Sequence, residues 1–349
     1  MTFAACGVII FVDKILVRHI MATFLATLTP MLTLFICIAA GFGAAKAKLL
    51  PENSGVTMAR LETWIFVPAL NITTMMRYCT VDSLSTHGTN VILATISVGA
   101  AMIIAIPLAR IFVREGGAER GIYCYALAFA NSGYMGDPIV LALFGEEVLA
   151  YYKIFCIPLT FAIYTWGASI LTPDGNAKGN PLKKLINPPT ISALLGIFLG
   201  LIGAVNYIPA FIINALDTLK ACMGPVAMLL AGVTVAKYDF FEMLKNKKVY
   251  IVTALRLTVL PAVLVALAFG IKSLANLIFG FSIGNDVLFL CFFSTGAALG
   301  LNTIIFPEAY GGNPKTGASM AMISNTLCVI SIPIMYAIMT AIFGTPYGA

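Results

Sequence analysis

The stretch FANSGYMGDPIVLALFGEE, residues 129–147, lies inside a long apolar segment of the chain. Eight consecutive residues of it, starting at Asn131, include an asparagine, a serine, two glycines, an aspartate and a proline. Gly133 and Gly136 weaken a helix, and Pro138 removes a backbone donor and clashes with the preceding turn. We therefore predict a helix that stops near Asn131, crosses as an extended segment and restarts near Pro138.

The rest of the chain has the composition of a polytopic membrane protein. Of its 349 residues, 60% are hydrophobic and 10% are charged, whereas a soluble domain carries about 25% charged residues. A helix needs about 20 apolar residues to span a bilayer core of roughly 30 Å. Ten runs approach or exceed this length: residues 27–45, 58–76, 90–112, 121–145, 149–172, 189–205, 209–236, 250–271, 286–309 and 317–343. We predict an all-α membrane protein with ten transmembrane helices.

Several other classes of function are excluded or disfavoured by the residue content. The net charge is +6, but the Lys and Arg residues lie in short loops rather than in a nucleic-acid-binding patch. The eight cysteines form no CxxC pair, and the two histidines, His19 and His87, are too few for a histidine cluster. No P-loop motif is present. We expect no metal site, cofactor, nucleic-acid partner or enzymatic activity.

The distribution of positive charge gives an orientation. Loops after odd-numbered spans hold most of the Lys and Arg residues between spans, whereas the even-numbered loops hold only Arg77 and Lys272. The positive-inside rule then makes the odd loops cytoplasmic and places both termini outside the plasma (inner) membrane. The longest loop, residues 174–188, is the predicted cytoplasmic linker. It separates five spans in residues 27–173 from five in residues 189–349, so the second half enters the membrane inverted.

The N-terminal segment, residues 1–26, has three interpretations. Met1–Val12 is too short to span and is followed by Asp13 and Lys14, so it is a signal-like segment or a helix lying on the membrane surface. In the third interpretation, the natural start is Met21, directly before the first long span.

Two local matches support a duplicated unit. LETWIFVPALN (61–71) and LDTLKACMGPVAM (216–228) both place Leu-acidic-Thr before a proline in mid-span. Phe129-Ala130-Asn131-Ser132-Gly133 in span four corresponds to Phe293-Ser294-Thr295-Gly296 in span nine, which is followed by Gly300, Asn302 and Pro307. Two broken spans at matching places in inverted halves favour a binding site at the membrane midplane. Each interruption alone is also compatible with a kinked packing helix.

The restarting half-helix presents free N–H groups and a partial positive charge, which suit an anion. Neutral hydrogen-bonding groups and small residues at the two interruptions complete the predicted site. The candidate substrate-binding residues are Asn131, Ser132, Gly133, Tyr134, Gly136, Pro138, Thr295, Gly296, Gly300 and Asn302.

Ionisable residues within spans are functional candidates because they are costly in lipid. Asp137 is a candidate for binding a coupling proton or sodium ion, or for capping the restarting half-helix. Lys153 is a candidate for neutralising a substrate carboxylate, or it snorkels to the outer interface. Asp217 and Lys220 are three residues apart and form a predicted structural pair. We expect Arg256 to reach the headgroups.

NSGYMGDPIVLALFG (131–145) resembles the fourth-helix crossover of the auxin efflux carrier family, which includes plant PIN-type carriers and bacterial malate or malonate permeases. FVPALN (66–71) resembles that family's second helix, and residues 301–334 resemble its ninth and tenth helices. The resemblance implies two inverted five-helix repeats with crossed broken helices four and nine, and a transport bundle that moves as an elevator. The family usually has a proline at the second crossover, where this chain has Ala298. The short central loop is similar to that of the bacterial members.

The leading functional hypothesis is a secondary active transporter of small organic anions such as dicarboxylates, embedded in the lipid bilayer and driven by membrane potential or a proton or sodium gradient. An anion or solute channel and a sensor module without active transport are the alternatives. Gly196 and Gly200 favour close helix contact within one chain or between two, which leaves a homodimer open.

Overall fold

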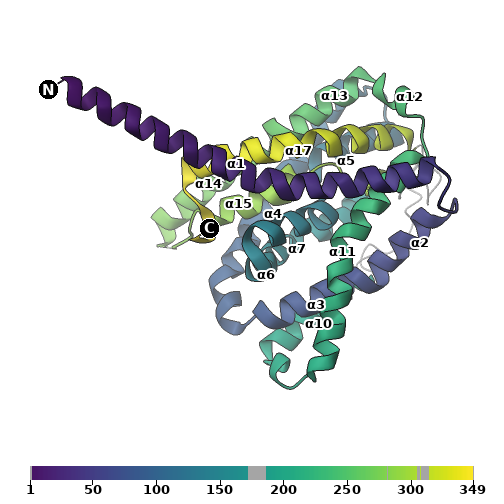
Figure 1. Ribbon diagram of the computed structural model, residues 1–349, viewed down its shortest axis with the longest axis horizontal. Helices are drawn as coiled ribbons and strands as arrows, with labels where there is room; N and C mark the ends of the chain where they lie inside the picture. The colour runs from purple at the N-terminus through teal and green to yellow at the C-terminus, as the bar shows by residue number, and fades with distance from the viewer. Residues whose placement is uncertain (1, 172–185, 281, 305–306, 308–313, 349) are drawn as a thin grey trace.

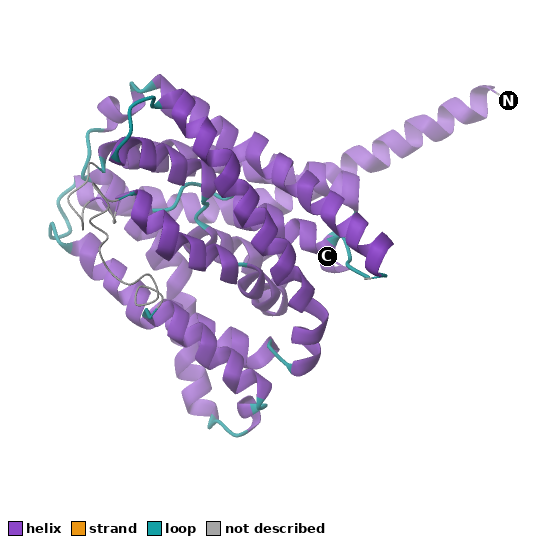
Figure 2. Ribbon diagram, turned by 180° about the vertical axis from the view of Figure 1, so that it is seen from behind, coloured by secondary structure: helices purple, strands orange, loops and turns teal. Residues whose placement is uncertain are grey.

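The computed structural model describes residues 2–171, 186–280, 282–304, 307 and 314–348, and every regular element within these ranges is a helix (Figures 1 and 2). Most of the predicted linker and the region around the predicted kink at Pro307 lie outside the described residues. The predicted N-terminal segment contributes the first part of helix α1, which extends away from the bundle (Figure 1).

Within the described residues, five helices have the length and apolarity of a complete membrane span, so the protein is a multi-pass membrane protein. They coincide with predicted spans one, three, seven, eight and ten. The five are α1 (Thr2–Lys46), α4 (Val81–Phe112), α11 (Ala210–Ala236), the run Lys247–Phe279, and α17 (Lys315–Phe343). Within α1, the candidate span is Met21–Lys46. The run Lys247–Phe279 consists of α13 (Lys247–Ala254), the π-helix η6 (Leu255–Val259) and α14 (Leu260–Phe279).

The other five predicted spans are built from shorter pieces. Span two comprises α2 (Ser54–Leu61), the π-helix η1 (Glu62–Phe66) and α3 (Val67–Tyr78). Spans four and five comprise α5 (Ala118–Ala128), η2 (Ser132–Gly136), α6 (Asp137–Phe155), α7 (Ile157–Ala162), η3 (Ile163–Gly167) and α8 (Ala168–Ile170). Span six is α10 (Pro188–Leu201), and span nine begins with α15 (Asp286–Gly296). A short α12 (Phe240–Leu244) precedes α13.

Two helix pairs pack at very short range through glycines. α1 packs against α11, and α10 packs against α3. A Cβ on Gly232 would lie 2.0 Å from the Ile38 carbonyl oxygen, and one on Gly200 would lie 2.6 Å from the Met75 carbonyl oxygen. Gly196 likewise lies against the Asn71 carbonyl. Small residues let backbones approach closely in membrane helices, and Gly196 and Gly200 do so here within one chain.

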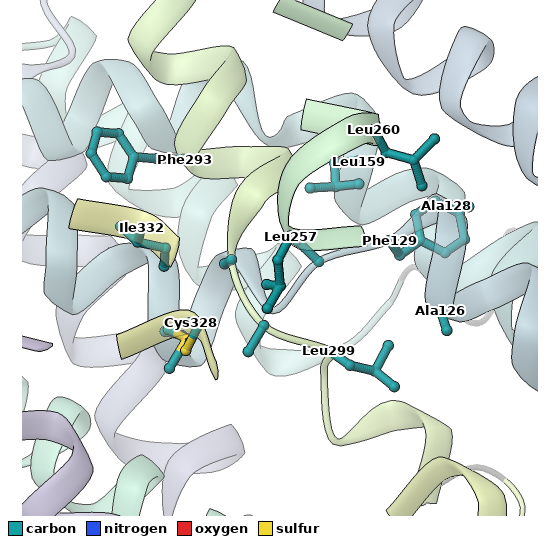
Figure 3. Close-up of a cluster of buried hydrophobic side chains, with 14 of the residues drawn as sticks. Ala126, Ala128, Phe129, Leu159, Leu257, Leu260, Phe293, Leu299, Cys328 and Ile332 are labelled. Atoms are coloured by element: carbon teal, nitrogen blue, oxygen red, sulfur yellow. The ribbon is translucent and has the colours of Figure 1, made fainter. Parts of the chain in front are cut away.

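The centre of the molecule is a continuous apolar core around the interruptions in spans four and nine. Phe129, Leu257 and Leu299 gather there from three separate segments, with Cys328 and Ile332 of α17 nearby (Figure 3). Each of these five residues is at most 3% exposed, and Phe129 and Cys328 are fully buried. The core therefore fixes the two interruptions in protein rather than in lipid.

Candidate functional site

The interruption in span four begins where α5 ends at Ala128. Phe129 is extended, with φ −123° and ψ 132°, and the chain becomes helical again at Ser132. The break is therefore present, but the prediction that the helix restarts near Pro138 was wrong. Pro138 already lies in the first turn of α6.

Asn131 explains the early restart. Its side-chain oxygen accepts a hydrogen bond from the Tyr134 amide at 3.2 Å, and its carbonyl oxygen accepts from the Met135 and Gly136 amides at 3.3 and 3.0 Å. A side-chain cap of this kind satisfies donors that a helix start leaves unpaired. Pro138 is the second residue of α6, which directly follows the π-helical turn Ser132–Gly136.

The interruption in span nine follows α15. The helix ends at Gly296, Ala297 is extended with φ −66° and ψ 163°, and helix resumes over Asn302–Ile304. A Cβ on Gly296 would lie 2.8 Å from the Phe292 ring, so this position requires glycine unless the ring moves. Thr295 donates its hydroxyl to the Cys291 carbonyl of its own helix at 2.7 Å.

The two interruptions touch. The Asn131 amide donates to the Ala298 carbonyl at 2.8 Å, and a Cβ on Gly300 would lie 3.8 Å from the Asn131 Cα. Asn302 donates its side-chain amide to the Tyr125 hydroxyl of α5 at 3.0 Å. Backbone groups released at membrane depth need such partners because lipid offers none. This contact between the two interruptions, which we call the crossing, forms with Ala298 at the position where the resemblance implies a proline.

Arg256 supports the second interruption. Its side chain is 2% exposed, and Nη2 donates to the Ala297 carbonyl at 3.2 Å. The prediction that it reaches the headgroups was therefore wrong, because a long side chain on η6 turns into the core instead. Ser324 of α17 adds a second support by accepting from the Leu299 amide at 3.0 Å. An arginine inside an apolar run was the sequence signal for this role.

A cavity of about 280 Å³ lies beside the crossing. The predicted site residues in its lining are Asn131, Ser132, Gly133, Tyr134, Gly300 and Asn302, together with Asp137 and Lys153. Across from them, α3 and α10 contribute Val67, Asn71, Met75, Pro189 and Thr190, which sequence reasoning missed. Gly136, Pro138, Thr295 and Gly296 are absent from the lining, as are Asp217 and Lys220. Gly136, Pro138, Thr295 and Gly296 belong to the interrupted segments but do not face the cavity.

Lys153 and Asp137 form an ion pair in this wall. Their side chains are 14% and 3% exposed, so Lys153 does not snorkel to the interface, contrary to that interpretation. Asp137 does not cap the half-helix either, because the helix begins at Ser132. Gly145, with φ 82°, bends α6 between the two partners and returns Lys153 to Asp137. Pairing is what makes two buried charges tolerable.

Tyr152, the neighbour of Lys153, clamps the first interruption. It is fully buried. Its hydroxyl lies at hydrogen-bond distance from two backbone carbonyl oxygens, that of Ser132 at 3.1 Å and that of Phe293 at 3.3 Å. A Cβ on Gly136 would lie 2.2 Å from that hydroxyl. Gly136 therefore makes room for the clamp rather than binding a solute directly.

The predicted Asp217–Lys220 pair is confirmed at 3.3 Å, and it belongs to a larger network. Arg77 of α3 contacts Asp217 at 2.6 Å and Glu146 at 3.2 Å, and Lys220 contacts Glu146 at 2.6 Å. Glu146 follows the bend at Gly145. The network thus connects α3 and α11 to the second half of α6.

Comparison with known proteins gives two matches. The profile of a family described as membrane transport protein matches residues 26–180 and 176–336. An uncharacterized transporter from Methanocaldococcus jannaschii is 34% identical over 110 residues, which are 30% of this chain and 35% of the relative. The aligned part thus spans about a third of that relative.

Proposed function

Because the chain belongs to the membrane transport protein family, which includes the auxin efflux carriers, we propose that it is a secondary active transporter of small organic anions such as dicarboxylates. The observation that carries this proposal is the contact between the two interrupted helices at a cavity whose wall contains Lys153. Irregular backbone at membrane depth is tolerated where it lines a cavity, and many secondary carriers bind their substrates at such broken helices.

The proposed architecture is ten spans in two inverted repeats, residues 27–173 and 189–349, joined by a cytoplasmic linker at 174–188. The helix packing supports it, because two helix contacts each have a counterpart when the repeats are exchanged. α1 packs on α11, which joins spans one and seven. α10 packs on α3, which joins spans six and two, the corresponding pair when the repeats are exchanged. Likewise, α4 packs on α5 and α14 packs on α15, which are spans three and four and spans eight and nine.

An anionic substrate follows from the charges in the wall. Asp137 pairs with Lys153 in the cavity wall, and an entering carboxylate competes with Asp137 for the ammonium group. The start of the half-helix at Ser132 adds a positive dipole end from the same side. A volume of about 280 Å³ lies at the small end of ligand pockets, which range over roughly 300–1,000 Å³. These features favour a small carboxylate over a large amphipathic solute.

The proposed motion is that of an elevator, in which the crossing moves against a scaffold that contains α3, α10 and α11. The cavity supports this division because part of its lining comes from the crossing and part from α3 and α10. The glycine-mediated contact between α10 and α3 suits a rigid scaffold. Asp137 remains the sequence-based candidate for ion coupling.

Transport in proteoliposomes tests the proposal. We expect saturable uptake and counterflow of labelled malate or malonate by the wild type. Asp137→Asn/Lys153→Gln, which neutralises the buried pair, should abolish uptake while the purified protein stays folded. Glu242→Gln/Lys315→Gln is the matched control, because it neutralises a pair whose side chains are 53% and 50% exposed. Wild-type uptake by the buried-pair variant would remove the pair from the site, and non-saturating flux without counterflow would identify a channel.

The proposed orientation, with both termini outside the plasma (inner) membrane, has its own test. In a cysteine-free background, a cysteine at position 180 should react with an impermeant maleimide only from the cytoplasmic side. A cysteine at position 346 should react only from outside. Reaction of both from the same side would contradict the ten-span topology.

A further inference from the structure

Glu62 is a fully buried carboxylate without a partner. Its exposed fraction is 0%, and within the described part of the chain neither carboxylate oxygen has a hydrogen-bond partner. It lies in span two, at the first position of η1. The transport hypothesis above assigns it no role.

The π-helix places Glu62 on the same face of span two as the cavity wall. The Val67 amide donates to the Glu62 carbonyl, five residues earlier, where an α-helix would pair it with residue 63. Val67, Asn71 and Met75 then follow at four-residue spacing along the cavity. Trp64, by contrast, is 68% exposed on the outer side. The π-helical turn contains one residue more than an α-helical turn, and this extra residue rotates the Glu62 carboxylate toward the interior of the protein.

The helices packed around Glu62 offer it no counter-charge. They are α2, α3, α10 and α11, whose titratable side chains are Arg60, Arg77, Tyr78, Asp217, Lys220 and Cys222. Arg60 is exposed, and the ion network holds Arg77, Asp217 and Lys220 near the far end of span two. α10 has no titratable residue, and neither does α11 between Met223 and Ala236.

The position opposite Glu62 on α11 follows from contacts on either side of it. Gly55 lies against Val233, and Arg77 contacts Asp217. Along span two, Glu62 lies between Gly55 and Arg77, so it faces the stretch of α11 that has no titratable residue. From the crossing, Tyr134 contributes a hydroxyl that interacts electrostatically with Glu62 and pairs with Thr63.

An ionised carboxylate in such a place is very costly, so a group of this kind stays neutral until water or a cation reaches it. We propose that Glu62 is a proton-binding site that couples proton movement to transport by the crossing bundle. The carboxylate holds a proton while Tyr134 and α11 cover it. When the bundle moves and hydrates the carboxylate from one side of the membrane, Glu62 releases the proton to that side, and it takes up a proton from water on the other side before it is covered again. This proposal rests on the proposed function.

Glu62→Gln tests it because the amide has the shape of the protonated acid and cannot release a proton. With radiolabelled malonate in proteoliposomes, we expect wild-type counterflow from this variant and no accumulation driven by an imposed pH gradient. Glu62→Asp, which keeps a carboxyl group, should retain gradient-driven accumulation at a reduced rate. Glu52→Gln, the same change at an exposed residue just before α2, should behave as the wild type.

The outcomes separate the two proposals. Accumulation by Glu62→Gln that follows the pH gradient as in the wild type would overturn the role of Glu62. So would wild-type transport that ignores the pH gradient or requires sodium instead. Absence of malonate counterflow by the wild type would instead contradict the proposed function itself, and with it the coupling.

Discussion

The backbone amide of Asn131 donates to the backbone carbonyl of Ala298 at 2.8 Å, so the two interrupted helices are joined by their main chains. Neither side chain takes part in this bond. The bond therefore depends on how Arg256, Ser324 and Tyr152 hold the extended segments in place. Those three side chains are the points at which the crossing can be tested.

Arg256→Met should destabilise the protein. The substitution keeps most of the apolar volume but leaves the buried Ala297 carbonyl without its donor, and an unsatisfied buried polar group costs about 1–3 kcal/mol. We expect a lower Tm for the purified protein in detergent. Arg110→Met, at an exposed position near the end of α4, is the matched control. Equal melting temperatures for both variants would show that Arg256 does not support the interruption.

Gly136→Ala and Gly133→Ala should differ sharply. A Cβ on Gly136 meets the Tyr152 hydroxyl at 2.2 Å, whereas one on Gly133 has no heavy atom within 4 Å. Overpacking costs about 1–3 kcal/mol, so Gly136→Ala should lower Tm and Gly133→Ala should not. Because Gly133 lines the cavity, its variant should instead change the KM for the transported anion.

A double mutant isolates the clamp. Tyr152→Phe removes the hydroxyl and should recover part of the stability lost in Gly136→Ala, because residues in contact have non-additive effects. Additive effects of the two substitutions on the free energy of unfolding would contradict the proposed contact.

Single neutralisations of the buried ion pair should cost more than the double one. Asp137→Asn leaves the Lys153 ammonium buried without its partner, and breaking a buried pair in this way costs about 3–5 kcal/mol. Adding Lys153→Gln removes the remaining charge and should restore stability, although not transport. Thermal unfolding of the two single variants and the double variant measures this difference. A double variant less stable than either single variant would refute the pairing.

The ion network between α3, α11 and α6 should contribute little to stability and depend on salt. Arg77 and Glu146 are 26% and 29% exposed, and partly exposed pairs contribute about 0–1 kcal/mol. Glu146→Gln should therefore lower stability by about 1 kcal/mol or less at low salt. The difference from the wild type should shrink at high salt, because salt screens exposed charges. Glu147→Gln is the control at the adjacent residue, which contacts Tyr151 rather than the network.

Much of the fold was predictable because helix formation in a membrane is governed locally. Long apolar runs predicted the five continuous spans, and the polar, glycine-rich stretches predicted where helices cannot continue. Proline as a helix-start signal predicts a boundary near Pro138, whereas the helix begins at Ser132. The Asn131 side chain, which can cap a helix start by itself, was the stronger signal.

The sequence by itself determined which segments are helices, where two of them are interrupted, and that ionisable residues such as Asp137, Lys153 and Arg256 stand within apolar runs. Only the tertiary structure decided which residues those groups meet. Lys153 turned to Asp137 rather than to the interface, and Arg256 turned to the broken helix. Among the residues that the structure describes, Glu62 met no hydrogen-bond partner. The physical reason is that backbone hydrogen bonding and apolar content are local properties of the chain. The partner of a buried charge, by contrast, depends on the packing of helices that are far apart in sequence.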